Sequence, residues 1–229
     1  MKLNLISIST AIIFLGSCSS MSNLKKSEAY KGFYSEEPTT VLLMPPINRS
    51  TNVEAKEFFH STLHTPLADK GFYVIPPFLS MEILRKESAY DSENFLNTSL
   101  SKFGEVFGAD MALFTIIHRW DKGFSSVKVE VEYLIKSCKT NELIYTRRGT
   151  INYNTMTSSG AGGAFGAIAN LALTAVKTLS TKYVDVARIC NSYTFSDIPV
   201  GKYCAKNPME KDELAGKKVF KVNLNSQNQ

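Results

Sequence analysis

Thr39-Thr40-Val41-Leu42-Leu43-Met44 is a short apolar run that stops at Pro45-Pro46, and it predicts a buried β-strand with a sharp exit. Apolar residues at helical spacing follow over 53–70, interrupted by Pro66, and Phe72-Tyr73-Val74-Ile75 then predicts a second strand. A strand, a helix and a strand within this length form a βαβ unit, which favours a sheet with at least one parallel pair. We therefore expect an α/β fold.

The second half of the chain predicts antiparallel strands and a long helix. Residues 111–117 form a continuous apolar run, which we expect in the middle of the sheet. Residues 127–135 alternate apolar and charged side chains, and 143–153 do so again after a tight polar connection, so the two runs predict an antiparallel hairpin. Residues 164–189 are strongly helical. The expected fold is a single α/β domain of two or three layers, with a mixed sheet and a long C-terminal helix.

The composition is that of an ordinary globular chain. It has 229 residues, of which 44% are hydrophobic and 21% are charged, so it can bury a core without disulfides or metals. The net charge of +5 is modest, and the basic residues are scattered rather than gathered in a stripe. This pattern argues against nucleic acid as the main partner and is compatible with a mild attraction to anionic lipid headgroups.

The amino terminus indicates the compartment. Residues 1–17 have a positive start at Lys2, an apolar run over 5–15 and then small residues, which is the layout of a secretory signal peptide. Leu15-Gly16-Ser17-Cys18 resembles the lipobox, in which the thiol of the cysteine is alkylated with diacylglycerol. We expect cleavage before Cys18 and lipidation there; the alternative is a plain signal peptide with an accidental cysteine. Ser19 is not the aspartate of an inner-membrane retention signal, which favours the outer membrane, with the domain in the periplasm.

These observations predict four regions. They are a signal peptide over 1–17, a lipidated cysteine with a flexible tether over 18–37, an α/β periplasmic domain over 38–205 and a loose polar tail over 206–229. Neither an internal repeat nor a second domain is apparent in the sequence.

The four cysteines do not form a metal or redox motif. Cys18, Cys138, Cys190 and Cys204 include no CxxC pair and do not stand near histidines at zinc-finger spacing. If Cys18 carries lipid, at most one disulfide can form in an oxidising compartment. We predict a Cys190–Cys204 disulfide, because both lie in the loop-rich end of the chain. Cys138, at a strand end, is interpreted as a half-buried structural cysteine, with a reactive thiol as the alternative.

Four blocks of sequence together resemble the bacterial lipoprotein family called domain of unknown function 799. They occur in the family's order and span most of the mature chain: Val41–Ser50, Thr65–Val74, Phe107–Phe114 and Ile198–Tyr203. The resemblance implies an α/β fold like the amino-terminal domain of TolB and the periplasmic domain of the curli secretion lipoprotein CsgG. It also implies a role in envelope assembly or export, because members are commonly encoded beside a CsgG-like lipoprotein, and it implies no established enzymatic activity. Residues 120–124 depart from the family's pattern.

No stretch of the sequence assembles a convincing catalytic site. His60 and His64 stand four apart on a predicted helix and could face one metal, but a third ligand is not evident, so exposed helix histidines are favoured. The glycines over 160–166 precede a helix as in a dinucleotide loop, but they follow a hairpin and lack the lysine of a P-loop. We interpret the small residues over 162–175 as a surface for close helix packing.

We therefore predict no catalytic residue, no metal and no cofactor, and we interpret Glu130 and Glu132 as solubilising residues. The first functional hypothesis is a non-enzymatic lipoprotein of the envelope that docks with partner lipoproteins of the CsgG type, through a sheet edge or the small-residue helix, and that is compatible with a homo-oligomer. The second is a carrier of a small ligand or peptide, which predicts an apolar pocket with a few polar groups. A hydrolase is the least favoured hypothesis.

Overall fold

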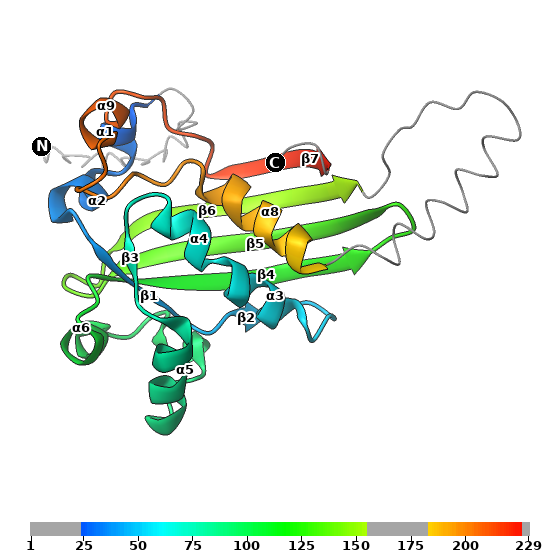
Figure 1. Ribbon diagram of the computed structural model, residues 1–229, viewed down its shortest axis with the longest axis horizontal. Coiled ribbons are helices and arrows are strands. Elements are labelled where there is room, and N and C mark those ends of the chain that lie inside the picture. The colour runs from blue at the N-terminus through cyan, green and yellow to red at the C-terminus, as the bar shows by residue number, and fades with distance from the viewer. Residues whose placement is uncertain (1–23, 155–182, 226–229) are drawn as a thin grey trace, which may run out of the picture.

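The computed structural model describes residues 24–154 and 183–225 (Figure 1). The predicted signal peptide, Cys18, the glycine-rich segment 160–166 and the start of the predicted helix over 164–189 lie outside these residues. Within the described ranges no helix is both long enough and apolar enough to cross a membrane.

One mixed sheet organises the described chain. Its strands lie in the order β3-β1-β4-β5-β6-β7, and β2 pairs with β4 beyond the end of β1. The strands are β1 Thr40–Leu43, β2 Ile47–Asn48, β3 Tyr73–Val74, β4 Met111–Lys122, β5 Ser126–Ser137, β6 Leu143–Asn154 and β7 Val219–Asn225.

The opening βαβ unit is confirmed. β1 runs parallel to both of its neighbours, with Thr40 opposite Tyr73 on β3 and Val41 opposite Met111 on β4. The single helix expected over 53–70 is instead two short helices, α3 (Ala55–Thr62) and α4 (His64–Ala68). Pro66 lies in the first turn of α4, where a missing backbone N–H removes no helical hydrogen bond.

The long strands β4, β5 and β6 form the antiparallel part of the sheet, as predicted. Burial alternates along β5: the apolar residues from Val127 to Ile135 face the core, whereas Glu130 and Glu132 are only partly buried. On β4 all seven residues over 111–117 are buried, as expected of a strand in the middle of a sheet. The predicted α/β class with a mixed sheet is therefore confirmed.

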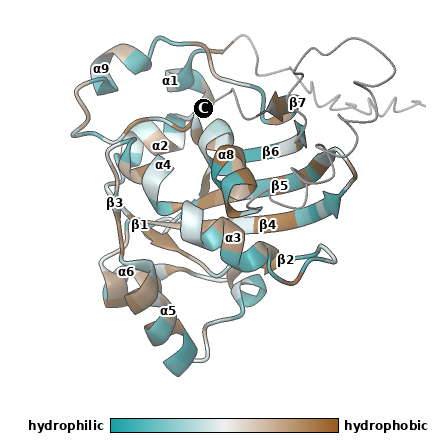
Figure 2. Ribbon diagram, turned by 45° about the vertical axis from the view of Figure 1, so that its right-hand side comes forward, coloured by the Kyte–Doolittle hydropathy of each residue, from teal (hydrophilic) through white to brown (hydrophobic). Residues whose placement is uncertain are grey.

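Helices cover both faces of the sheet, so the domain has three layers. α3, α4 and α8 (Tyr183–Phe195) lie on one face, while α5 (Pro77–Lys86) and α6 (Ser101–Phe107) lie on the other (Figure 1). Val41 and Leu43 belong to the larger core on the α8 side, and Leu42 to the smaller core on the α5 side. Figure 2 shows hydrophobic stretches of the central strands beneath α3 and α8.

The segment expected to be a flexible tether folds from Lys26 onward. It forms α1 (Lys26–Ala29) and α2 (Lys31–Glu36) in the structure. The physical reason is that Tyr30 and Phe33 are buried in the larger core, so this segment packs on the domain. The expectation of a flexible tether is wrong for these residues.

The tail expected to be loose from Lys206 is also ordered. It contains α9 (Asn207–Glu210) and the edge strand β7, which pairs in parallel with β6. Phe220 packs on Tyr193 of α8, with ring centroids 5.3 Å apart. It pairs with Gly149 of β6, and its ring occupies the space that a side chain at Gly149 would need, because a Cβ there would lie only 2.3 Å from the ring. Apolar residues at every second position therefore hold this strand to the sheet.

Gly201→Ala is expected to destabilise the domain. A Cβ at Gly201 would lie 2.6 Å from the carbonyl oxygen of Gly71, and the Gly201 N–H donates to the Lys70 carbonyl at 2.8 Å, so the loop cannot move away without breaking that bond. We expect a loss of about 1–3 kcal/mol of unfolding free energy, measured by urea unfolding. Gly104→Ala on α6 is the control: its Cβ meets the Ala109 carbonyl at 3.4 Å, and helix propensity favours alanine by about 1 kcal/mol. Equal urea midpoints for the two variants would contradict this prediction.

Candidate functional site

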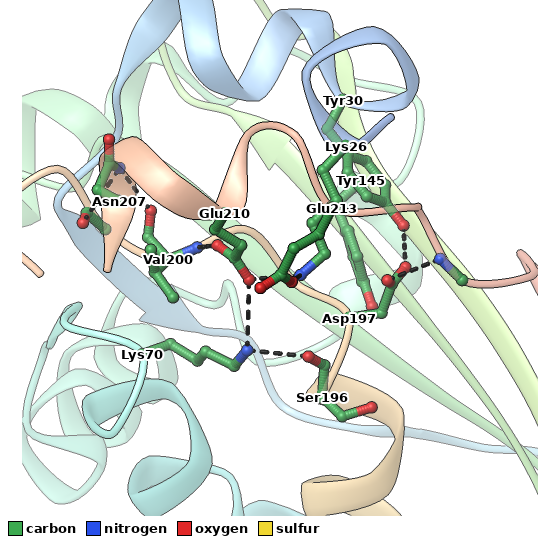
Figure 3. A network of polar contacts seen from close by, with 12 residues as sticks. Lys26, Tyr30, Lys70, Tyr145, Ser196, Asp197, Val200, Asn207, Glu210 and Glu213 are labelled. Carbon is green, nitrogen blue, oxygen red and sulfur yellow. Dashed lines mark hydrogen bonds and ion pairs between the residues drawn. The ribbon is translucent and has the colours of Figure 1, made fainter. Parts of the chain in front are cut away.

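The first and last helices of the described chain, α1 and α9, meet in a buried polar network. Figure 3 shows its centre, where α1, α9 and the loop after α8 come together. Lys26 forms an ion pair with Glu210, and its Nζ lies 3.1 Å from Glu213 Oε2. The side chains of Lys26 and Glu210 are only 5% and 6% exposed. We call Lys26, Lys70, Glu210 and Glu213 the lysine–glutamate cluster.

Glu210 joins three segments that are distant in the sequence. Its Oε2 accepts the backbone N–H of Val200 at 2.7 Å, and its Oε1 lies 3.8 Å from Lys70 Nζ. Lys70 Nζ in turn donates to the carbonyl of Ser196 at 2.8 Å. The carboxylate thus holds α1, the end of α4 and the loop after α8 in one arrangement.

The charges of the cluster suit its buried position. Burial disfavours the charged form of Lys26, but the hydrogen bonds and negative charges of Glu210 and Glu213 outweigh it and raise the pKa of Lys26 above its ordinary value. Burial lowers the pKa of Lys70, and the charge of Glu210 only partly opposes this effect. Lys26 is therefore the principal counter-ion of the cluster.

A second part of the network is built on Asp197. Its carboxylate accepts a hydrogen bond from the Tyr30 hydroxyl and another from the backbone N–H of Gly216 at 2.7 Å. Arg147 lies beside it and donates to the carbonyl of Thr194 at 2.6 Å and to that of Lys217 at 3.3 Å. Asp197 and Arg147 thus fasten the first helices and the segment before β7 to the end of α8.

The charged groups of the network are engaged within the described part of the chain. Each of its charged groups is engaged by another charged group or by backbone, and its central ion pair is closed to solvent. Breaking a buried ion pair costs free energy, so the network keeps the segments that it joins together. The attached segment is α1, the first described helix after Cys18.

Two cavities near the sheet contain further polar side chains. One of about 500 Å³ is lined by Asp110 and Cys138 among others. Burial opposes ionisation of Asp110, but three hydrogen bonds from Thr39 and Thr40 outweigh it and lower its pKa. Burial raises the pKa of Cys138 to about 12, which disfavours the reactive thiolate and supports the structural interpretation of this cysteine.

The second cavity, of about 370 Å³, lies at the exit of β2. Asn48 closes a local turn there, accepting the backbone N–H of Ser50 at 3.0 Å, and Arg49 pairs with Glu93 at 2.9 Å. The buried hydroxyl of Ser92 has no partner among the described residues. Positive and negative side chains line this cavity together, so it favours no single ligand charge.

With this geometry established, the chain can be compared with known proteins. The sequence profile of the family described as "Putative lipoprotein GNA1162-like" matches residues 28–200, which is most of the chain. The chain belongs to the GNA1162-like family. A curated relative, "Putative lipoprotein NMB1124/NMB1162" of Neisseria meningitidis serogroup B, is 22% identical over 95 residues, covering 42% of this chain and 44% of the relative. The match thus spans less than half of that relative's length.

Several solved structures are similar to parts of the GNA1162-like chain. Lipoprotein GNA1162 from Neisseria meningitidis has a TM-score of 0.47 at 16% identity, over 61% of this chain and 98% of that one. A PelC dodecamer from Paraburkholderia phytofirmans has a TM-score of 0.42 at 11% identity, over 70% and 88%. The C-terminal domain of LpoB from Salmonella enterica has a TM-score of 0.36 at 17% identity, over 56% and 98%. No function follows from these similarities.

Family membership confirms that the chain is a relative of bacterial lipoproteins, as the four blocks predicted. The name domain of unknown function 799 and the likeness to TolB and CsgG domains stay predictions. The closing block, Ile198–Tyr203, now has a physical explanation: it carries the Val200 N–H that binds Glu210 and the glycine that passes close to Gly71.

The predicted disulfide is not formed in the structure, where Cys190 and Cys204 are free thiols. Cys190 lies on α8 with no exposed surface, and burial raises its pKa. Cys204 is partly exposed, and its Cβ packs beside Gly71. The disulfide and the lipidation of Cys18 stay predictions.

The two histidines lie on different helices. His60 is on α3 and His64 on α4, and the described residues contain no group of three His, Cys, Asp or Glu placed to hold a metal. His64 is exposed as expected, but His60 is partly buried, its Nε2 has no partner among the described residues, and burial lowers its pKa.

The two glutamates on β5 are more than solubilising residues. Glu130 binds Arg148 at 2.7 Å, and Glu132 lies 2.8 Å from His118, so each pairs across a neighbouring strand. Sequence reasoning missed Lys26, Tyr30 and Glu210 entirely. The signal that could have found them is the aromatic pair at 30 and 33, which gives the supposed tether an apolar side.

Lys26→Met is expected to destabilise this GNA1162-like domain strongly. Removing one partner of a buried ion pair leaves Glu210 charged and largely without compensation, which costs about 3–5 kcal/mol. Urea unfolding followed by circular dichroism measures the loss. Lys25→Met is the matched control, because Lys25 pairs with Asp212 at the exposed surface and its removal should barely move the urea midpoint. If both variants unfold at the same urea concentration, the cluster is not the attachment we describe.

Proposed function

We propose that this protein is a lipoprotein of the bacterial envelope, acylated at Cys18 and anchored in the outer membrane with its domain in the periplasm. It serves as a non-enzymatic accessory protein in envelope assembly or export and acts by docking to partner proteins. The observation that carries the proposal is the match of residues 28–200 to the GNA1162-like lipoprotein family.

The polar network supports this role. It joins α1, which begins eight residues after Cys18, to α9 and to the segments after α4 and α8, so an anchor at Cys18 would hold the whole domain rather than a loose segment. Its acids and bases are committed to structure, which fits a docking protein better than an enzyme. We also propose that residues 1–17 are the signal peptide of this lipoprotein.

The edge of β7, which pairs with no second strand among the described residues, is the docking surface that we propose. β3, at one edge of the sheet, has two residues, whereas β7 has seven and could receive a strand from a partner. Arg148 N–H donates to the Lys218 carbonyl at 2.7 Å, so the backbone of residues 220, 222 and 224 faces β6 and that of 219, 221 and 223 faces outward. We propose a lipoprotein of the CsgG type as the partner, with a second copy of this chain as the rival occupant, and no nucleic acid.

A carrier of a small ligand or peptide is the second candidate. It is favoured by a cavity of about 310 Å³ between α5 and α6, whose lining is mostly apolar, as such a carrier requires. The lining includes Leu84, Ala89, Phe95, Phe103, Val106 and Phe107.

A pull-down from detergent-solubilised envelopes tests the first proposal. Tagged full-length protein is expected to show the mass of an acylated Cys18 and to recover a lipoprotein partner in amounts comparable to the bait. Cys18→Ala is the control and should lack the acyl mass. An acylated bait recovered alone would favour the carrier, and an unmodified Cys18 would refute the anchor.

Lys221→Pro tests the docking edge. Proline removes one outward-facing N–H of β7 without touching a bond to β6, and edge strands tolerate such a proline. We expect partner recovery to fall about tenfold, because strand addition depends on main-chain hydrogen bonds, while the urea midpoint changes little. Lys221→Ala removes the same charge but keeps the N–H, and it should bind normally. If both variants recover equal amounts of partner, docking does not use this edge.

A further inference from the structure

The end of the molecule nearest the proposed anchor differs in charge from the rest. We call the segments 24–31 and 202–218 the anchor end. The first segment contains α1 and the second contains α9, and these two helices lie together at the opposite end of the molecule from α5 (Figures 1 and 2). These segments contain eight lysines and four carboxylates, a net charge of +4 out of the chain's +5. The rest of the chain is therefore close to neutral.

The carboxylates of the anchor end are largely occupied. Glu210 is buried against Lys26, Glu213 also pairs with Lys26, and Asp212 pairs with Lys25. In contrast Lys206, Lys217 and Lys218 are exposed, and none of them forms an ion pair within the described chain. The surface field here is therefore positive and available to an external anion.

Large apolar side chains are exposed among these lysines. Met209 is 72% exposed, Leu214 is 65% exposed and Tyr203 is 80% exposed. The strand-like bridge between Lys25 and Leu214 holds Leu214 beside α1, and the buried Glu210 holds its neighbour Met209 at the surface. Exposed apolar residues set among lysines are the composition of surfaces that lie on anionic membranes.

The length of chain between the anchor and the domain decides which surface can reach the bilayer. Six peptide units separate Cys18 from Leu24, and a fully extended chain of that length spans at most about 21 Å. A twelve-residue strand such as β4 is itself about 40 Å long. An acylated Cys18 therefore keeps the anchor end within reach of the headgroups and the far end of the sheet away from them.

We propose that the anchor end binds directly to the anionic phospholipid headgroups of the membrane that holds Cys18. Lys206, Lys217 and Lys218 contact the lipid phosphates, and Met209 and Leu214 enter the interface between headgroups and acyl chains. The rigid lysine–glutamate cluster transmits this contact to the sheet, so the domain has one orientation on the membrane. This inference rests on the proposed acylation of Cys18.

Lysine footprinting tests the docking on the intact, acylated protein. The protein is reconstituted in vesicles of phosphatidylcholine alone or with about a third phosphatidylglycerol, and lysines are labelled with an amine-reactive ester and quantified by mass spectrometry. We expect labelling of Lys206, Lys217 and Lys218 to fall about fivefold in the anionic vesicles. The reason is that an anionic surface favours the bound state of each nearby lysine over the free state by about a factor of five. Lys86 and Lys102, exposed on α5 and α6, are internal controls that should not change.

Variants separate specific docking from general attraction. Met209→Ser with Leu214→Ser should reduce the protection to less than about twofold, because both side chains are exposed and their removal leaves the fold intact. Lys217→Gln with Lys218→Gln should abolish the protection of Lys206, whereas Lys86→Gln with Lys102→Gln, which removes the same charge, should not.

Two failures are distinguishable in this experiment. If the protein carries the acyl mass but its lysines label equally in both kinds of vesicle, the docking proposal is overturned and the anchor stands. If the acyl mass is absent, the anchor of the proposed function is refuted, and the docking inference falls with it.

Discussion

The buried carboxylate of Glu210 determines how the first and last helices of the described chain, α1 and α9, are held. A charge so far from water is costly unless cations and donors surround it, and here they come from Lys26, Lys70 and the Val200 backbone. These groups lie in α1, after α4 and after α8, so satisfying one carboxylate draws three separate segments together. The carboxylate of Asp197 likewise joins separate segments, because it accepts hydrogen bonds from the Tyr30 hydroxyl and from the backbone N–H of Gly216.

The sheet provides the rigid body to which this network is attached. Over residues 111–117 β4 is buried on both faces, it pairs with β5 from Met111 to Lys122, and the two cores on either side share its side chains. The charged groups of the lysine–glutamate cluster join segments of the chain to this body. The surfaces that remain for function are the periphery: the edge of β7, the shallow cavities and the end that carries α1 and α9.

Sequence reasoning succeeded where a structural element is defined by its own side chains. The run around Val41–Leu43 is apolar at every position because both faces of β1 are covered, and Val127–Ile135 alternates because only one face of β5 is. It failed at both ends of the domain. The period-two pattern of Phe220, Val222 and Leu224 is visible in the sequence, but lysines and asparagines separate these residues, so the strand was mistaken for a polar tail. Nothing in the sequence around Lys26 distinguishes it from an exposed lysine of a flexible tether.

The features that could be read from the sequence alone are local: the lipobox-like pattern at Cys18, the βαβ opening, the long hairpin and the relation to bacterial lipoproteins. These follow from residue types at fixed short spacings. Only the tertiary structure decided that α1 and α9 form one unit, because the pairing of Lys26 with Glu210 joins residues 184 positions apart. No periodicity encodes a contact at that separation; it exists because the folded sheet brings two oppositely charged side chains to the same buried place.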